Sequence, residues 1–180
     1  TLILARQHHQ AGRLQEAEAA YRQILQAQPD HADALHLLGV IAHQQGKADL
    51  AIEYISRAIA INAQAAEYYN NLGVVYQAVG ELEHAAAQYR EALALRPAYA
   101  QASYSLGTVF QAQGKPAEAE AQYRQTLAVQ PDHAVACCKL GDVLKGQCKF
   151  VEAVAQYRRA LALNAGYIDA YNNLGIALMG

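Results

Sequence analysis

Apolar residues along this chain recur at helical spacing in short segments, and each segment is followed by a break. A first segment of about fourteen residues carries apolar positions every three or four residues, a glycine follows, and a second segment repeats the pattern. Side chains at that spacing fall on one face of an α-helix. The pattern therefore predicts an all-α protein made of antiparallel helix-turn-helix hairpins.

The hairpin pattern returns every 34 residues. A Leu-Gly pair marks each return, at Leu38-Gly39, Leu72-Gly73, Leu106-Gly107, Leu140-Gly141 and Leu174-Gly175. A second series in the same register consists of Tyr21, Ile55, Tyr89, Tyr123 and Tyr157. Because such short helices are marginal alone, each hairpin is expected to bury its apolar face against its neighbours.

Glycine and proline separate the helices. The turn glycines are Gly12, Gly46, Gly80 and Gly114, and prolines follow the second helices at Pro29, Pro97 and Pro131. Glycine accepts the left-handed conformation that closes a helix, and proline ends one by removing a donor. Where alanine replaces this proline, Asn62 and Asn164 precede it and are expected to end the helix in the left-handed conformation. Cys148 replaces a turn glycine, which predicts either a strained turn or a shift toward Gly146.

The glycine of each Leu-Gly pair lies inside a predicted helix, where it costs about 1 kcal/mol relative to alanine. A compensating close approach of the partner helix is therefore expected at this position.

The third unit reads Tyr69-x2-Leu72-Gly73-x2-Tyr76, then Ala85-x3-Tyr89, then Pro97. This signature resembles the tetratricopeptide repeat, abbreviated TPR. The resemblance implies a right-handed superhelical solenoid. It places the units at 1–31 (truncated), 32–65, 66–99, 100–133, 134–167 and a half unit at 168–180, which together form a single array.

In this family the first helices line the concave side of the superhelix, so the resemblance implies a groove that binds a protein or peptide. The positions that would face it carry Asp33, His36, His43, Glu67, Asn70, Asn71, Gln77, Gln101, Tyr104, Ser105, Thr108, Lys139, Asp142, Lys145, Asn172 and Asn173. Side-chain amides both donate and accept, which suits the backbone of an extended peptide. A merely solvated polar face is the alternative.

Two modes of binding known in this family use the same positions. Asn71 and Asn173 match an asparagine ladder in arrays resembling that of O-linked N-acetylglucosamine transferase, although Leu37, Ser105 and Lys139 interrupt it. A carboxylate clamp for acidic C-termini needs several basic residues at these positions. Only Lys139 qualifies, so this clamp is disfavoured.

Composition argues against several other functions. The formal charge is -2 without long runs of either sign, which disfavours nucleic acid. The related pentatricopeptide arrays bind RNA but have a 35-residue period and usually a basic face. No apolar stretch is long enough to cross a membrane. Three cysteines, two of them adjacent, fit reduced thiols in a cytoplasmic protein.

No catalytic or cofactor motif is recognisable, so no enzyme activity, cofactor or metal is predicted within the chain. His36 and His43 are about 10 Å apart along a helix, too far to ligate one ion. His9 and His43 occupy equivalent positions and could approach each other, but two imidazoles alone make a weak site. Cys137 is expected in the core and Cys138 on the exposed groove side.

Two functional hypotheses remain. The first is a scaffold or adaptor that binds a peptide or partner helix. The second is the substrate-recruiting arm of a larger enzyme such as a glycosyltransferase, because Asp33-Ala-Leu-His-Leu-Leu-Gly39 and Asn70-Asn-Leu-Gly73 look similar to bacterial arrays that precede such domains. The chain is expected to be a fragment. Residues 168–180 would then present uncovered Tyr171, Leu174 and Leu178 and could support end-to-end self-association.

Overall fold

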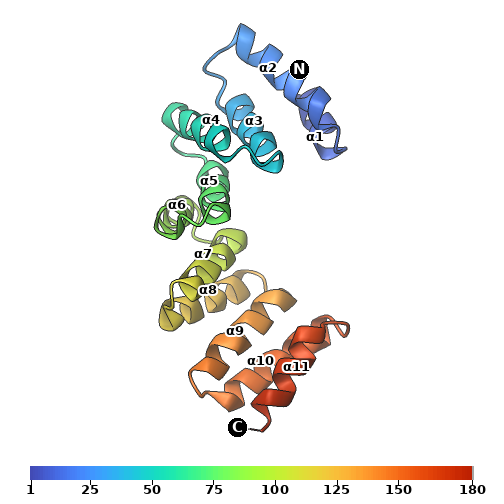
Figure 1. Cartoon of the computed structure of the whole chain (residues 1–180), viewed down its shortest axis with the longest axis vertical. Helices are drawn as coiled ribbons and strands as arrows, with labels where there is room; N and C mark the ends of the chain where they lie inside the picture. The colour runs from blue at the N-terminus through green and yellow to red at the C-terminus, as the bar shows by residue number, and fades with distance from the viewer. Residues whose placement is uncertain (180) are drawn as a thin grey trace. The chain divides into compact units, whose positions relative to one another are not determined.

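The computed structural model describes residues 1–179, which form eleven α-helices and no strand (Figure 1). The bounds are α1 (Leu2–Gln10), α2 (Leu14–Ala27), α3 (Ala32–Gln44), α4 (Ala48–Ile61), α5 (Ala66–Ala78), α6 (Leu82–Leu95), α7 (Ala100–Ala112), α8 (Pro116–Val129), α9 (Ala134–Gly146), α10 (Phe150–Leu163) and α11 (Ile168–Ala177). The predicted all-α class is confirmed.

Consecutive helices pack as hairpins, such as α3 with α4 and α9 with α10 (Figure 1). First helices α3, α5, α7 and α9 each have 13 residues, and second helices each have 14. The chain divides into two compact units, unit 1 at residues 1–95 and unit 2 at residues 96–180. Unit 1 contains α1 to α6, and unit 2 contains α7 to α11.

The turn inside each hairpin follows the sequence prediction. All four turn glycines have φ between 69° and 82°. Cys148 adopts φ 60° at the equivalent place, and the Lys149 amide donates to the Leu144 carbonyl at 2.9 Å as Lys115 does to Phe110. The turn has therefore kept its position, and the predicted alternative of a shift toward Gly146 is wrong. Cys148 instead holds a conformation that is costly for a residue with a Cβ.

The second helices that lack a following proline end in a different way from the one expected. Asn62 and Asn164 have φ of -135° and -145°, so the predicted left-handed conformation is wrong. Their side-chain oxygens instead accept from the backbone amides of Gln64 at 3.1 Å and Gly166 at 3.0 Å. This Asx turn redirects the chain without proline because the side chain mimics a backbone acceptor.

The glycine of the Leu-Gly pair permits a close contact with the partner helix. A Cβ placed on Gly73, Gly107 or Gly141 would lie 2.6 to 2.7 Å from the ring of the tyrosine on that helix. These tyrosines, Tyr89, Tyr123 and Tyr157, are fully buried. In these three hairpins a tyrosine ring packs directly on a glycine, and in the α3–α4 hairpin Ile55 packs on Gly39 in the same way, which explains why glycine is tolerated inside these helices.

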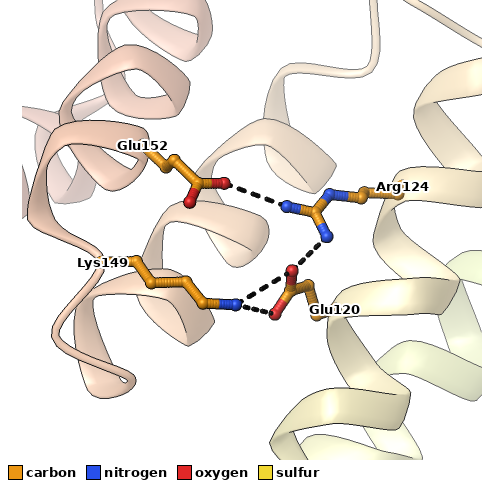
Figure 2. A network of polar contacts seen from close by, with 4 residues as sticks. All are labelled: Glu120, Arg124, Lys149 and Glu152. Carbon is orange, nitrogen blue, oxygen red and sulfur yellow. Dashed lines mark hydrogen bonds and ion pairs between the residues drawn. The ribbon is translucent and has the colours of Figure 1, made fainter.

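Charged side chains connect neighbouring repeats in unit 2. Glu120 on α8 is buried and accepts from Lys149 Nζ at 3.1 Å and from Arg124. Figure 2 shows Arg124 also reaching Glu152 on α10, at 3.1 Å. Burial raises the pKa of Glu120, but hydrogen bonds from Lys149 and Gln147 and the charge of Arg124 together lower it. The network therefore favours an ionised Glu120 that ties α8 to the next hairpin.

Unit 1 has a related arrangement between its first two hairpins. Glu18 on α2 accepts from Gln45 at 2.9 Å and from Arg22 at 2.7 Å. Glu18 precedes Arg22 by four residues, as Glu120 precedes Arg124, and Gln45 corresponds to Gln147 in the repeat. A glutamate on a second helix and a glutamine in the next turn therefore connect adjacent repeats in both units.

The last helix and Leu178, the residue that follows it, expose several apolar side chains. Tyr171, Ile176 and Leu178 are 52 to 59% exposed, whereas Leu174 is half-buried. A Cβ on Gly175 would meet no atom within 4 Å among the described residues. The face of α11 that corresponds to the covered face of earlier first helices is thus open, and self-association through it stays a prediction.

Candidate functional site

The first helices of unit 1 bring several predicted groove residues together. Asp33 on α3 forms an ion pair with Arg6 on α1, with 2.9 Å between Oδ2 and Nη2. Its other oxygen accepts from the hydroxyl of Tyr68 on α5. One carboxylate thus connects three successive first helices, and it raises the pKa of Tyr68 together with the burial that is the larger cause.

His36 lies beside this carboxylate and is buried. Its Nε2 is 2.8 Å from the Asn71 side-chain nitrogen, and its ring packs on Tyr68 with centroids 4.4 Å apart. Burial lowers the pKa of His36 to about 4, against the opposing charges of Asp33 and Glu67. The imidazole is therefore neutral at pH 7, and its Nε2 accepts a hydrogen bond from the Asn71 amide.

Asn70 supports this pair from within the core. It is only 4% exposed, and its Nδ2 donates to Asn71 Oδ1 at 3.2 Å. Its own side-chain oxygen is buried without a hydrogen-bond partner among residues 1–179. The buried Asn70 therefore holds the Asn71 side chain from the core side, and of the two only Asn71 is partly accessible to solvent.

A pocket of about 730 Å³ opens beside these residues, entirely within unit 1. Its lining consists of Arg6, His9, Gln10, Tyr21, Asp33, His36, Leu37, Gln44, Asn62, Ala65, Glu67 and Tyr68. The wall is polar and carries both signs of charge. Of the sixteen residues predicted to face the groove, Asp33, His36 and Glu67 line it.

Several residues of this pocket were missed by the sequence reasoning. Arg6, His9 and Gln10 lie 34 residues before Val40, His43 and Gln44, and of these three His43 was predicted to face the groove. The repeat register links His9 to His43, but His9 was considered only as a metal ligand, and the groove positions were not extended to the truncated first unit. Tyr68 was also detectable, because it departs from the repeat pattern. Other units have alanine at this position, as at Ala34 and Ala102.

The remaining predicted groove residues of unit 1 lie near the ends of their helices. His43 is half-buried in the last turn of α3 and is not part of the pocket lining. Gln77 accepts from the hydroxyl of the buried Tyr89 at 2.9 Å. Its oxygen thus completes the hairpin core, so its side chain has a structural role whatever else it binds.

In unit 2 the predicted residues of α7 are partly internal. Ser105 is buried, and Gln101 Nε2 is 3.4 Å from its hydroxyl. Thr108 donates to the Ser105 carbonyl at 2.7 Å, inside the helix. Tyr104 is half-buried and stacks on the His133 ring at 5.0 Å, so an aromatic pair lies between α7 and the start of α9.

Asp142 is the centre of a second cluster in unit 2. It accepts from the Tyr157 hydroxyl and from the Asn173 amide, each at 2.9 Å, and lies 3.9 Å from Lys139 Nζ. Lys145 donates to the Asn173 oxygen at 2.9 Å. The side chains of α9 and α11 are therefore bound to one another here, while Asn172 on α11 is exposed.

Asn71 and Asn173, the two asparagines that match the peptide-binding ladder, both form hydrogen bonds within the chain. Asn71 is bonded to His36 and Asn70, and Asn173 to Asp142 and Lys145. Each would have to exchange or share these bonds in order to bind a peptide backbone. Their predicted role stays a prediction.

The cysteines do not follow the expectation at one position. All three are free, and Cys137 is buried as predicted, but Cys138 is only 1% exposed. The predicted exposure of Cys138 is therefore wrong, and its thiol is hydrogen-bonded to Tyr167, the residue that precedes α11. Burial raises the pKa of both thiols, which keeps them protonated and poorly reactive at neutral pH.

The described residues, 1–179, offer neither a metal-binding cluster nor a membrane-spanning helix. No group of three or more His, Cys, Asp or Glu side chains in that range is placed to hold a metal ion. His9 bonds to Gln44, with 3.2 Å between Nε2 and Oε1. None of the described helices has the length and apolar character needed to cross a membrane.

Models of known protein families match the chain. Models described as "Tetratricopeptide repeat" match residues 4–69 and 99–165, and one described as "TPR repeat" matches residues 78–114. A search of curated protein sequences gives no match.

Solved structures share the fold. MamA is 27% identical with a TM-score of 0.82, covering 89% of this chain and 94% of its own. TTC0263, a thermophilic TPR protein of Thermus thermophilus, is 25% identical with a TM-score of 0.71, covering 99% and 97%. YrrB, described as a TPR protein with an unusual peptide-binding site, is 18% identical with a TM-score of 0.79 over 95% and 88%, a likeness that shows the fold alone.

The repeat register, the hairpins and these matches agree along most of the chain. Proteins built from this repeat are generally scaffolds for interactions with other proteins. This chain therefore belongs to the tetratricopeptide repeat family.

Proposed function

We propose that this chain is a non-enzymatic interaction module that binds a peptide or partner helix on the first helices of its units. The observation that carries the proposal is the pocket of about 730 Å³ in unit 1. Its volume suits one or two side chains of a bound segment, and its polar wall offers fixed donors and acceptors around a concave surface.

Unit 2 supports the same proposal with a different surface. The half-buried Tyr104 stacks on the ring of His133, and the exposed Gln101 lies three residues before Tyr104 on the same helix. Tyrosine contributes a large contact area at low entropic cost, which is why it is enriched at binding surfaces. A partner would find an aromatic anchor beside a side-chain amide at this place.

A peptide library displayed on phage and panned against the immobilised chain tests the proposal. We expect bound sequences whose affinity falls when Asp33→Ala and Glu67→Ala are combined in unit 1, or Gln101→Ala and Tyr104→Ala in unit 2. The matched control combines Arg57→Gln and Glu91→Gln, which are exposed residues on second helices. Absence of any binder, or equal loss in the control, would contradict the proposal.

The recruiting arm of a larger enzyme is the alternative, and it stays a prediction. It rests on the segments at 33–39 and 70–73 and places any catalysis outside residues 1–180. The coding sequence downstream of Gly180 tests it directly. A glycosyltransferase domain there would support it, and further repeats or a stop would contradict it.

A further inference from the structure

The pocket of unit 1 has a charge balance that selects among partner side chains. Its formally charged residues are Arg6, Asp33 and Glu67, so the lining carries one net negative charge. His36 adds none at neutral pH because its Nε2 accepts a hydrogen bond from Asn71. A concave wall with this balance attracts a cation.

We propose that this pocket binds the arginine or lysine side chain of a partner segment, with Asp33 and Glu67 as the anionic groups and the Tyr21 hydroxyl as an acceptor at the floor. The inference rests on the proposed function, since it names the chemistry of the segment that the first helices would bind.

Arg6 already shows how Asp33 binds a guanidinium. Its Nη2 lies 2.9 Å from Asp33 Oδ2, and the two side chains are 49% and 40% exposed. Exposed ion pairs of this kind are weak, so they exchange readily. Arg6 therefore acts as an internal competitor that an incoming guanidinium or ammonium group displaces.

Tyr21 provides an observation that is independent of the charges. It is fully buried, lines the pocket, and its hydroxyl has no hydrogen-bond partner among residues 1–179. At the same repeat position Tyr89 and Tyr123 donate to Gln77 and Gln111, each at 2.9 Å.

The residue that corresponds to Gln77 in the first unit is His9, because the two are separated by two repeat lengths. The His9 ring lies edge-on to Tyr21 with centroids 6.3 Å apart, and its Nε2 is paired with Gln44 instead. Buried polar atoms without a partner are rare. When the His9 ring shifts, an N–H of a ligand in the pocket reaches Tyr21. It then donates to the Tyr21 hydroxyl oxygen, which otherwise has no partner.

Nuclear magnetic resonance titration of the whole chain tests the inference with defined small probes. The probes are N-acetyl-arginine amide, N-acetyl-lysine amide, N-acetyl-glutamine amide and N-acetyl-glutamate amide. We expect saturable shifts of backbone amides around Arg6 and Glu67 with the two cationic probes. The glutamine and glutamate probes should leave these amides unchanged.

Substitutions around the pocket should change the affinity for the arginine probe in opposite directions. Asp33→Asn and Glu67→Gln should each lower the affinity for the arginine probe about threefold or more. Asp169→Asn, the same charge change at the equivalent position of α11, should leave that affinity unchanged. Arg6→Ala should raise the affinity for the arginine probe because it removes the competing cation. Tyr21→Phe should lower that affinity while raising thermal stability, since it removes an unsatisfied hydroxyl.

The opposite results overturn the inference. If the glutamate probe binds and Arg6→Ala abolishes that binding, the pocket is an anion site. If no probe shifts unit 1 while the phage library yields binders, the inference fails and the proposed function stands. If the arginine probe binds but the library yields nothing, the proposed function fails independently of the pocket chemistry.

Discussion

The side-chain nitrogen of Asn71 lies 2.8 Å from Nε2 of His36, across two successive first helices. An amide nitrogen only donates, so the bond requires a neutral imidazole. Burial favours the same state and lowers the pKa of His36 to about 4, even though Asp33 and Glu67 act to raise it. A residue pair that the sequence assigned to peptide binding is thus also a structural contact of unit 1.

This contact predicts an acid-sensitive unit 1. The pKa of His36 is below its unfolded value, so the unfolded state binds more protons between pH 6.5 and about 4, and stability falls as pH drops through that window. The loss has a ceiling of about 3 kcal/mol. Urea unfolding across this range should show a steeper pH dependence for the parent chain than for His36→Gln. His84→Gln, at an exposed histidine of α6, should keep the parental slope.

Two glycines at the same repeat position should respond oppositely to alanine. Gly141→Ala places a Cβ 2.6 Å from the Tyr157 ring and should cost about 2 kcal/mol or more, because the ring has to move in a packed core. Gly175→Ala meets no described atom within 4 Å and should be neutral or stabilise α11 by up to about 1 kcal/mol. Thermal unfolding followed by circular dichroism measures both. Similar losses in the two variants would contradict the packing explanation.

Replacing Cys148 by glycine should stabilise the turn between α9 and α10. The present φ of 60° costs a residue with a Cβ about 1–2 kcal/mol, and the greater entropy of glycine in the unfolded chain offsets part of the gain. A net stabilisation of about 0.5–1 kcal/mol is expected in denaturant titrations. Gly114→Ala, the reverse change at the equivalent turn, should destabilise. A stabilising Gly114→Ala would show that this turn does not require positive φ.

The Glu120 network should contribute measurably to the coupling of α8 to the next hairpin. Glu120→Ala removes the acceptor of both Lys149 and Arg124 and should cost about 2 kcal/mol. Glu118→Ala, at an exposed position of the same helix, should cost little. A double-mutant cycle with Lys149→Met isolates the pair, and a coupling energy near zero would show that the bond adds nothing to stability.

The exposed face of α11 should make the 180-residue chain self-associate. Tyr171 and Leu178, whose counterparts Cys137 and Leu144 are buried, are more than half exposed, and burying them against a second copy would remove apolar surface from water. Light scattering after size exclusion should show a mass that rises with concentration and returns to that of a monomer in Tyr171→Ser with Leu178→Ser. Val79→Ser, at an exposed apolar residue of unit 1, is the control. A monomer at all concentrations would contradict the prediction.

The sequence by itself determined the repeat, the helices, the glycine turns and the buried tyrosines. These features depend on local backbone preference and on apolar periodicity, both of which are readable within a few turns of chain. The burial of Tyr89 and the positive φ of Gly80 are of this kind, because each repeats at a fixed distance along the chain.

Only the tertiary structure decided how polar side chains on neighbouring repeats pair. Arg6 and Asp33 are 27 residues apart, and His36 and Asn71 are 35 apart. Whether such side chains meet depends on the small rotation between stacked hairpins and on rotamers chosen in a packed interior, which no periodicity encodes. For the same reason the burial of Cys138 and the unpaired hydroxyl of Tyr21 could be seen only once the helices were in contact.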